Sequence, residues 1–267
     1  MNLTSPSQVK AWCIENGFHP NKVLGQNFLI DRNALESIVD AAELPDGARV
    51  LEIGPGLGVL TEEMLRRGFS VTAIEKDPVL AERLAAALGN PSALEVRTGD
   101  ALDFIKDGSC DGFPALVSNL PYQAGTRILL ELAQRKEGAP ETATVLVQTE
   151  VAERLAAGPG SKTRGLAGVW VQLDYDVKIV RAVSASCFWP RPEIGSSVVR
   201  LVRHHRNDAL PAGMRDLFRR ITKQAFEHRR KQLGAIFKGI VESTARAEQL
   251  SNDDWLAFVE ALAEVSG

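Results

Sequence analysis

Five short apolar runs alternate with helical patterns in the first 150 residues, and this alternation restricts the fold more than any other feature of the chain. The first run, RVLEIG, leads into a helical pattern that stops at Gly68, and the second, SVTAIE, leads into one that begins near Pro78. Strands that are apolar on both faces and separated by helices predict βαβ units and a parallel sheet covered on both sides. The runs lie at 49–54, 70–75, 94–100, 115–120 and 144–148.

Two later runs, at 176–183 and 196–203, have no helical pattern between them. They predict an antiparallel pair at the edge of the same sheet, which then has seven strands. The predicted fold class is therefore α/β, with a Rossmann-like, mostly parallel sheet.

The pattern changes near 203–213, and every later stretch is helical in character. We therefore predict two domains, an α/β domain over 1–207 and a small all-helical domain over 208–267. The first domain begins with a short helical extension that is capped by Ser5 and stopped by Gly17. The C-terminal helices are expected at 214–227, 229–238, 242–250 and 252–264.

A glycine-rich turn follows the first strand, in the segment LEIGPGLG. Gly54 and Gly56 in this turn allow the backbone to approach a ligand closely, although such a turn can also be purely structural. Glu75 ends the second strand, where a carboxylate can accept hydrogen bonds from ribose hydroxyls. Asp100 ends the third strand, where it can accept from an adenine amino group, or else cap the next helix. Because parallel strands end at one crevice, these residues point to a nucleoside site.

The surroundings of this turn decide which nucleotide cofactor fits. The sequence has no basic group near the turn for a pyrophosphate and no P-loop lysine. A cofactor with adenine and ribose but without phosphate satisfies these conditions. We therefore predict S-adenosylmethionine.

The fourth strand runs into the tetrapeptide NLPY. The Asn119 Oδ1 atom and the carbonyl of Leu120 or Pro121 can accept the two N–H bonds of an exocyclic amino group on a nucleobase, which frees the nitrogen lone pair for attack. Tyr122 offers a ring on which the base can stack, so catalysis rests on positioning and electrostatics. The alternative is a turn in which proline ends the strand and tyrosine packs.

Positive charge is concentrated near the C-terminus, although the whole chain carries −3. Residues 200–238 contain eleven Lys and Arg against three Asp and Glu, while the remainder has 20 against 31. One basic patch on an acidic body predicts a phosphate-binding helical face for RNA, with a solvated face as the alternative. The residues predicted for this face are Arg219, Arg220, Lys223, Arg229, Arg230 and Lys231.

Several classes of protein are disfavoured by composition. Three distant cysteines, Cys13, Cys110 and Cys187, give neither a disulfide framework nor a zinc pattern and fit a reducing cytoplasm. We find neither a signal peptide nor a membrane span in the sequence, and we expect a cytoplasmic monomer without a metal.

With these residues in place, nearly the whole chain resembles the rRNA adenine N6-dimethyltransferases, above all the branch that modifies the bacterial small subunit. The motifs LGQNFLID, EIGPGLGVLT, SNLPY, FWPRPEIGSSVVRL and FEHRRKQL follow the family's order. The resemblance implies a class I methyltransferase fold in which the GQNFL segment covers the cofactor, so Asn27 and Leu29 line its pocket with Gly54, Glu75, Asp100 and Asn119. It also implies four methyl transfers onto two adjacent adenosines in a hairpin near the 3′ end of 16S rRNA, and a role in ribosome biogenesis.

Some positions depart from the family pattern or remain open. Gln123 and Ala124 replace the usual Asn-Ile, and TRGLAGV replaces the usual YGRLSV, which leaves that loop's RNA contacts uncertain. Phe188 can stack on the target base opposite Tyr122 or pack in the core. The N-terminal extension has no assigned role.

Three rival functions are considered. A large-subunit dimethylase of the macrolide-resistance type is disfavoured because such proteins are basic throughout. A glutamine or DNA-adenine methyltransferase is disfavoured because Leu120 replaces the proline of its NPPY motif. The third is an assembly factor whose catalysis is incidental, and sequence does not separate that role from the chemistry.

Overall fold

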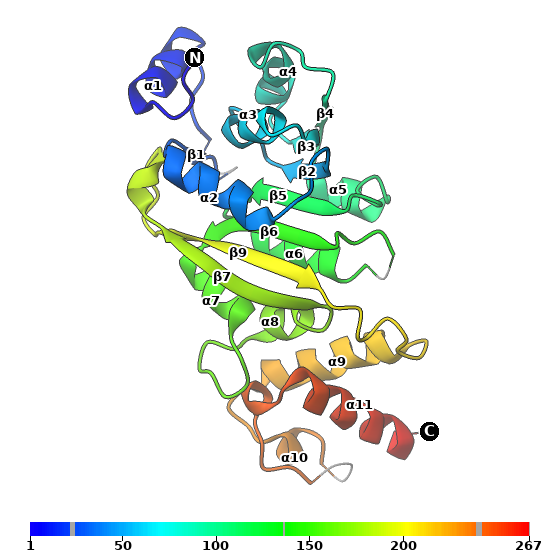
Figure 1. The fold of residues 1–267 in the computed structure, drawn as a ribbon. Helices are drawn as coiled ribbons and strands as arrows, with labels where there is room; N and C mark the ends of the chain where they lie inside the picture. Colours follow the sequence, from blue (N-terminus) through cyan, green and yellow to red (C-terminus); the bar gives the residue numbers. More distant parts are fainter. Residues whose placement is uncertain (22–24, 136, 239–241, 267) are drawn as a thin grey trace. The chain divides into compact units, whose positions relative to one another are not determined.

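The computed structural model describes residues 1–21, 25–135, 137–238 and 242–266 (Figure 1). Leu24, which begins the LGQNFLID motif, lies outside these residues. The chain divides into two compact units, Met1–Ala152 with Val177–Arg203, and Glu153–Asp176 with His204–Gly267.

The division differs from the predicted boundary at 207/208 in one segment, because residues 153–176 belong to the second unit. Packing explains the difference. Val169 and Leu173 are buried in one apolar cluster with Phe218 of the C-terminal helices.

The first unit is built on a seven-stranded sheet, which confirms the predicted number of strands. β2 pairs in parallel with both β3 and β5, so the order of strands reverses beside β2. Doubly wound sheets bind ligands at such a switch point. β9 runs antiparallel to β6 and separates it from the edge strand β7. In spatial order the strands are β4 (Leu94–Thr98), β3 (Ser70–Glu75), β2 (Arg49–Ile53), β5 (Ala115–Asn119), β6 (Thr142–Gln148), β9 (Ser196–Arg203) and β7 (Tyr175–Val183).

Local sequence explains where the helices of this unit begin. Asp31, Asp77 and Asp100 each accept a backbone N–H from the first turn of the helix that follows. The predicted extension helix is present and lies between Ser5 and Gly17, although the Ser5 side chain makes no capping hydrogen bond. The helices are α1 (Pro6–Glu15), α2 (Arg32–Ala42), α3 (Val59–Arg66), α4 (Pro78–Ala87), α5 (Ala101–Lys106) and α6 (Gly125–Ala133). A seventh, α7 (Thr149–Ala156), begins in this unit and ends in the second.

The second unit is helical, but two of its four predicted helices are wrong. Residues 229–238 contain only the four-residue α10, and 242–250 contain only one 3-10 turn. Helical hydrogen bonding is lost because the backbone pairs elsewhere: Leu233 N–H donates to Ala245 O and Gly234 N–H donates to Ser243 O. The elements are α8 (Leu166–Val171), α9 (Met214–Glu227), α10 (Leu233–Ile236), η2 (Ala247–Gln249) and α11 (Asn252–Ser266).

Candidate active site

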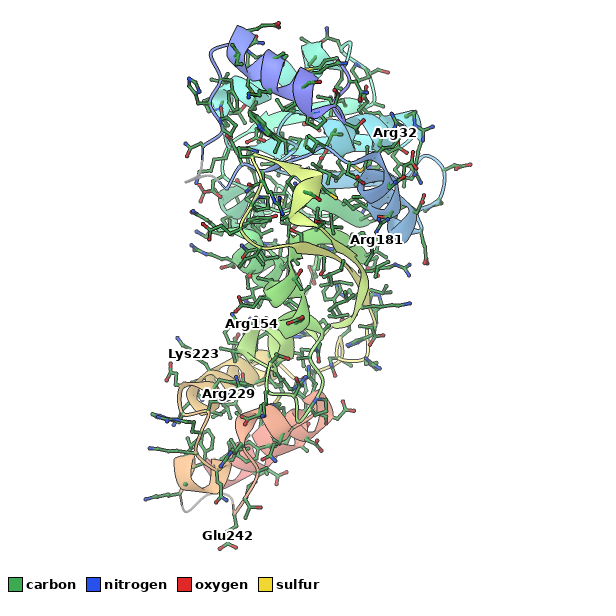
Figure 2. All side chains as sticks on the ribbon, turned by 90° about the vertical axis from the view of Figure 1, so that its left-hand side faces the viewer. Arg32, Arg154, Arg181, Lys223, Arg229 and Glu242 are labelled. Carbon is green, nitrogen blue, oxygen red and sulfur yellow. The ribbon has the colours of Figure 1, made fainter. Side chains whose placement is uncertain are left out.

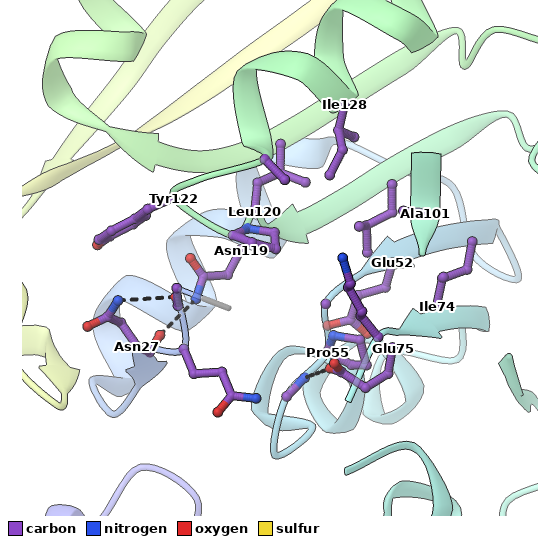
Figure 3. A pocket seen from close by; sticks show the side chains of 18 of the residues that line it. Asn27, Glu52, Pro55, Ile74, Glu75, Ala101, Asn119, Leu120, Tyr122 and Ile128 are labelled. Atoms are coloured by element: carbon purple, nitrogen blue, oxygen red, sulfur yellow. Dashed lines mark hydrogen bonds between the residues drawn. The ribbon is translucent and has the colours of Figure 1, made fainter. Parts of the chain in front are cut away.

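A cavity of about 350 Å³ opens at the carboxyl ends of β2, β3, β4 and β5 (Figure 3). Its walls combine these strand ends with the segment 25–29 from much earlier in the chain. Every residue predicted for the cofactor lines it, namely Asn27, Leu29, Gly54, Gly56, Glu75, Asp100 and Asn119, and so do Leu120, Pro121 and Tyr122.

Glu75 ends β3 with a buried carboxylate that holds the glycine turn. Its Oε2 atom accepts the Gly56 N–H at 3.0 Å, and its Oε1 atom accepts the Asp77 N–H at 2.9 Å. Burial raises the pKa of the Glu75 carboxyl, and these hydrogen bonds oppose the rise. A carboxylate has about four acceptor sites, so this one keeps capacity for hydroxyl groups of a ligand.

Asp100 has two structural partners at the end of β4. Its Oδ1 atom accepts the Leu102 N–H at 2.9 Å and caps α5, while Oδ2 pairs with the Lys76 ammonium at 2.8 Å. The Lys76 ammonium holds the pKa of the Asp100 carboxyl below its usual range. Sequence reasoning missed Lys76, which lines the cavity but is neutralised by this pair.

The segment 25–29 packs closely against the glycine turn that follows β2 and against the NLPY turn that follows β5. A Cβ atom placed at Gly25 would lie 3.2 Å from Tyr122 N, and one placed at Gly56 would lie 3.1 Å from the Phe28 ring. Both glycines have positive φ angles, of 68° and 60°. A side chain at either position would therefore strain the backbone and push the segment away from a turn.

Asn119 lies at the tip of β5 with its amide held in one orientation. Its Nδ2 atom donates to the Asn27 carbonyl at 3.3 Å (Figure 3). Its Oδ1 atom is buried and has no hydrogen-bond partner among the described residues. Because an unsatisfied buried acceptor costs about 1–3 kcal/mol, this oxygen is suited to a donor that a ligand brings.

The two candidate carbonyls that follow Asn119 differ in availability. The Pro121 carbonyl accepts the N–H groups of Ala124 and Gly125 at 3.1 and 2.8 Å, where α6 begins. In the part of the chain that the structure describes, no hydrogen bond to the Leu120 carbonyl is found. The Leu120 carbonyl is therefore better suited than the Pro121 carbonyl to act, beside Asn119 Oδ1, as the second acceptor for an amino group.

The two aromatic rings predicted to hold the base are placed very differently. Tyr122 lines the cavity, and its hydroxyl is 2.7 Å from Ser196 Oγ, which fixes the ring. Phe188 belongs to β8 (Phe188–Trp189), which pairs with β1 (Phe28–Leu29), and it is only 2 % exposed within the core. Core packing, the other interpretation of Phe188, therefore describes this structure, and its ring has no free face for a base.

The predicted basic face is not one helical surface. Arg219, Arg220 and Lys223 lie on α9, but residues 229–231 lie in the turn after it. Arg229, labelled in Figure 2, is a structural residue. It donates to the Lys162 carbonyl, and its Nε atom lies 3.5 Å from Glu248 Oε2.

Arg219 is also paired, because its guanidinium lies 3.7 Å from the Asp216 carboxylate. The other four of the six predicted cations are exposed and have no ion pair within the described ranges. Fixed carboxylates do not neutralise this group, so it is available to an anionic partner. The four are Arg220, Lys223, Arg230 and Lys231.

Comparison with known proteins decides the family. A family profile described as ribosomal RNA adenine dimethylase matches residues 17–262. The chain belongs to the ribosomal RNA adenine dimethylase family.

Relatives and solved structures agree with this assignment. Two proteins named ribosomal RNA small subunit methyltransferase A are similar: one from Bifidobacterium longum is 34% identical over 98% of this chain and 94% of its own, and one from Deinococcus radiodurans is 47% identical over 74% and 67%. The structure of the 23S rRNA methyltransferase ErmE is 26% identical, with a TM-score of 0.68 over 89% of this chain and 100% of its own. A dimethyladenosine transferase from Plasmodium falciparum, 24% identical over 89% of this chain and 97% of its own, has a TM-score of 0.76 and shares the fold.

The cofactor of this dimethylase is S-adenosylmethionine, and the cavity suits it. The buried Glu75 carboxylate can accept hydrogen bonds from ribose hydroxyls. The buried Asn119 Oδ1 can accept a hydrogen bond from a donor of the ligand. Gly54 and Gly56, both at positive φ, let the glycine turn pack against Pro121 and Phe28, which a side chain at either position would push away. No cluster of metal-binding side chains occurs among the described residues.

We expect Glu75→Ala to weaken S-adenosylmethionine binding while the fold is retained. Hydrogen bonds to a charged group are worth about 1.5–3 kcal/mol each, so loss of the ribose contacts should lower the affinity by at least about tenfold. Isothermal calorimetry measures this, with the exposed Glu62→Ala on α3 as the control. Equal affinities for the two variants would exclude the ribose role.

Glu52 is a residue of the cavity wall to which the sequence assigns no role. It is 1 % exposed, accepts the Thr61 hydroxyl at 2.6 Å, and burial raises the pKa of its carboxyl from 4.5 to about 8. Between these pH values the folded protein keeps a proton that the unfolded chain has released. The free energy of unfolding therefore falls as pH rises through this window.

We expect Glu52→Gln to reduce this pH dependence, because the amide still accepts from Thr61 but does not ionise. The difference in slope is at most about 1.4 kcal/mol per pH unit. Denaturant unfolding of both proteins from pH 5 to 9 measures it. Parallel pH profiles would show that Glu52 does not bind the proton.

Proposed function

We propose that this protein methylates the N6 amino groups of two adjacent adenosines near the 3′ end of 16S rRNA in the small ribosomal subunit. The observation that carries this substrate is the similarity to proteins named ribosomal RNA small subunit methyltransferase A, which extends over almost the whole chain at 34–35% identity. Each adenosine receives two methyl groups, so the enzyme acts four times and serves subunit biogenesis.

The residues of the chain bind, orient and position the target base. When bound, S-adenosylmethionine supplies the electrophilic methyl group. For an unmethylated adenine, Asn119 Oδ1 and the Leu120 carbonyl would accept the two N6 hydrogens and free the nitrogen lone pair for the methyl group. Each transfer releases one of these hydrogens as a proton to solvent, so the second transfer would use a single N6 hydrogen. Tyr122 stacks on the base, and Glu75 and Asp100 hold the adenosine part of the cofactor. The target base must leave its stack in the RNA to reach the cavity.

The second candidate is methylation of large-subunit rRNA, which the similarity to the ErmE structure favours. That similarity, at 26% identity, is lower than the 35% shared with the Mycobacterium avium small-subunit methyltransferase over 100% of this chain and 90% of its own. The small-subunit substrate is therefore preferred.

Incubation with labelled S-adenosylmethionine and under-methylated small subunits tests the proposal. The modified nucleotides are then mapped on the 16S rRNA, with large subunits as the parallel substrate. Two labelled adjacent adenosines near the 3′ end are expected. Label on the 23S rRNA alone would favour the second candidate.

The proposed partner is the small subunit or its precursor, bound by a monomer in the bacterial cytoplasm. The exposed cations of the second unit support an RNA partner, because phosphate contacts supply most sequence-independent affinity. Within the described residues, no helix is long and apolar enough to cross a membrane.

A further inference from the structure

The N-terminal extension reaches the cofactor cavity. Leu3 lines the cavity together with residues of the glycine turn and the NLPY turn, and only 6 % of its surface is exposed. Helix α1 fixes this position, because Val9 and Cys13 are buried in the same apolar core cluster as Leu3. An apolar side chain in a cavity wall contacts the non-polar surface of a ligand.

A series of aromatic rings connects α1 with the glycine turn. The ring centroids of Trp12 and Phe18 are 5.9 Å apart, and those of Phe18 and Phe28 are 6.2 Å apart. Phe28 in turn lies so close to Gly56 that a Cβ atom there would approach its ring to 3.1 Å. Gly56 N–H is the group that donates to Glu75. A shift of α1 would therefore move Phe28 and, with it, the Gly56–Glu75 contact at which the ribose is expected to bind.

The extension is also tied to α4, the helix that follows Glu75. The Arg83 guanidinium lies 5.8 Å from the centroid of the Trp12 ring, and its Nη1 atom donates to Asn16 Oδ1 at 2.8 Å. Gln26 Nε2 donates to Asp77 Oδ2 at 2.9 Å, beside the start of the same helix. These polar contacts hold both the extension and the 25–29 segment against one element of the cofactor site.

We propose that residues 3–18 belong to the S-adenosylmethionine site. Leu3 is a binding residue of its wall, and Trp12 is a positioning residue that acts through Phe18 and Phe28 on the glycine turn. This inference deepens the proposed function and rests on it only where methyl transfer to small subunits is the readout.

The test compares Leu3→Ala and Trp12→Ala with Ile14→Ala, a control on the same helix whose side chain is 70 % exposed. S-adenosylmethionine affinity is measured by calorimetry, and KM and kcat are measured with small subunits. Leu3→Ala should raise the dissociation constant and KM for S-adenosylmethionine by about four- to fifteenfold, the effect of losing one or two buried methylene contacts. Trp12→Ala, which acts through the glycine turn, should change both constants in the same direction. The kcat at saturating cofactor should stay within about twofold of wild type, because the acceptor groups around Asn119 are untouched.

Controls separate binding from folding and from the proposed function. Leu3→Met, which keeps an apolar side chain of similar volume, should retain wild-type affinity. If Leu3→Ala does not fold, Trp12→Ala decides, since it leaves the wall residue in place. Unchanged affinity in the folded test variants would overturn the inference. Failure of the wild-type protein to methylate small subunits would instead overturn the proposed function, while the calorimetric comparison would still stand.

Discussion

Asn119→Ala is expected to lower the rate of methyl transfer at saturating S-adenosylmethionine by about 10²–10³-fold, the loss seen when one preorganised electrostatic partner of a transition state is removed. The substitution removes the buried Oδ1 acceptor and also the Nδ2 donor to the Asn27 carbonyl. Some loss of cofactor affinity is therefore expected as well. Affinity for small subunits should change little, because the proposed RNA contacts are made by the exposed cations Arg220, Lys223, Arg230 and Lys231 and not by Asn119.

Single-turnover kinetics with small subunits measures this effect without a contribution from product release. The control is Asn33→Ala, the same substitution at an exposed position outside the cavity. A near wild-type rate for Asn119→Ala would exclude the acceptor pair as the source of catalysis. Growth of cells that carry only the folded Asn119→Ala protein would further separate methylation from a role as an assembly factor.

Replacement of Arg220, Lys223, Arg230 and Lys231 by alanine is expected to weaken small-subunit binding by about hundredfold at low salt. Each lost phosphate contact also reduces the slope of log affinity against log salt by about one unit. Arg229 is left intact, because it holds the Lys162 carbonyl and pairs with Glu248. S-adenosylmethionine affinity should not change, since every described residue that lines the cavity belongs to the first unit.

Titration with small subunits at two salt concentrations measures both effects. A charge-matched comparison uses the double variant Arg230→Ala with Lys231→Ala against Lys10→Ala with Lys106→Ala, two cations of the first unit. If both double variants lose the same affinity, total charge rather than this surface determines binding. Wild-type affinity and slope in the quadruple variant would show that the cations are merely solvated.

The strands and the residues around the cavity were predictable from the sequence alone. The five parallel strands alternate with helices and leave an apolar pattern in the sequence, and two later apolar runs predicted the other two strands, so all seven were found. Parallel strands place their carboxyl ends at one edge, so the order of Gly54, Glu75, Asp100 and Asn119 was enough to predict that they share a cavity. Both inferences rest on local patterns, namely short apolar runs and the residues that directly follow them.

The other features of the structure depend on contacts between segments that are distant in the sequence. A local sequence pattern does not record such contacts. Pairing of residues 232–234 with 243–246 replaced two predicted helices. Phe188 is buried because β8 pairs with β1. Arg229, predicted to contact RNA, instead pairs with Glu248. Leu3 entered the cofactor cavity only because α1 packs against the core. The physical reason is that local propensity and period set elements and strand ends, whereas burial and hydrogen-bond partners depend on which distant residues the fold brings together.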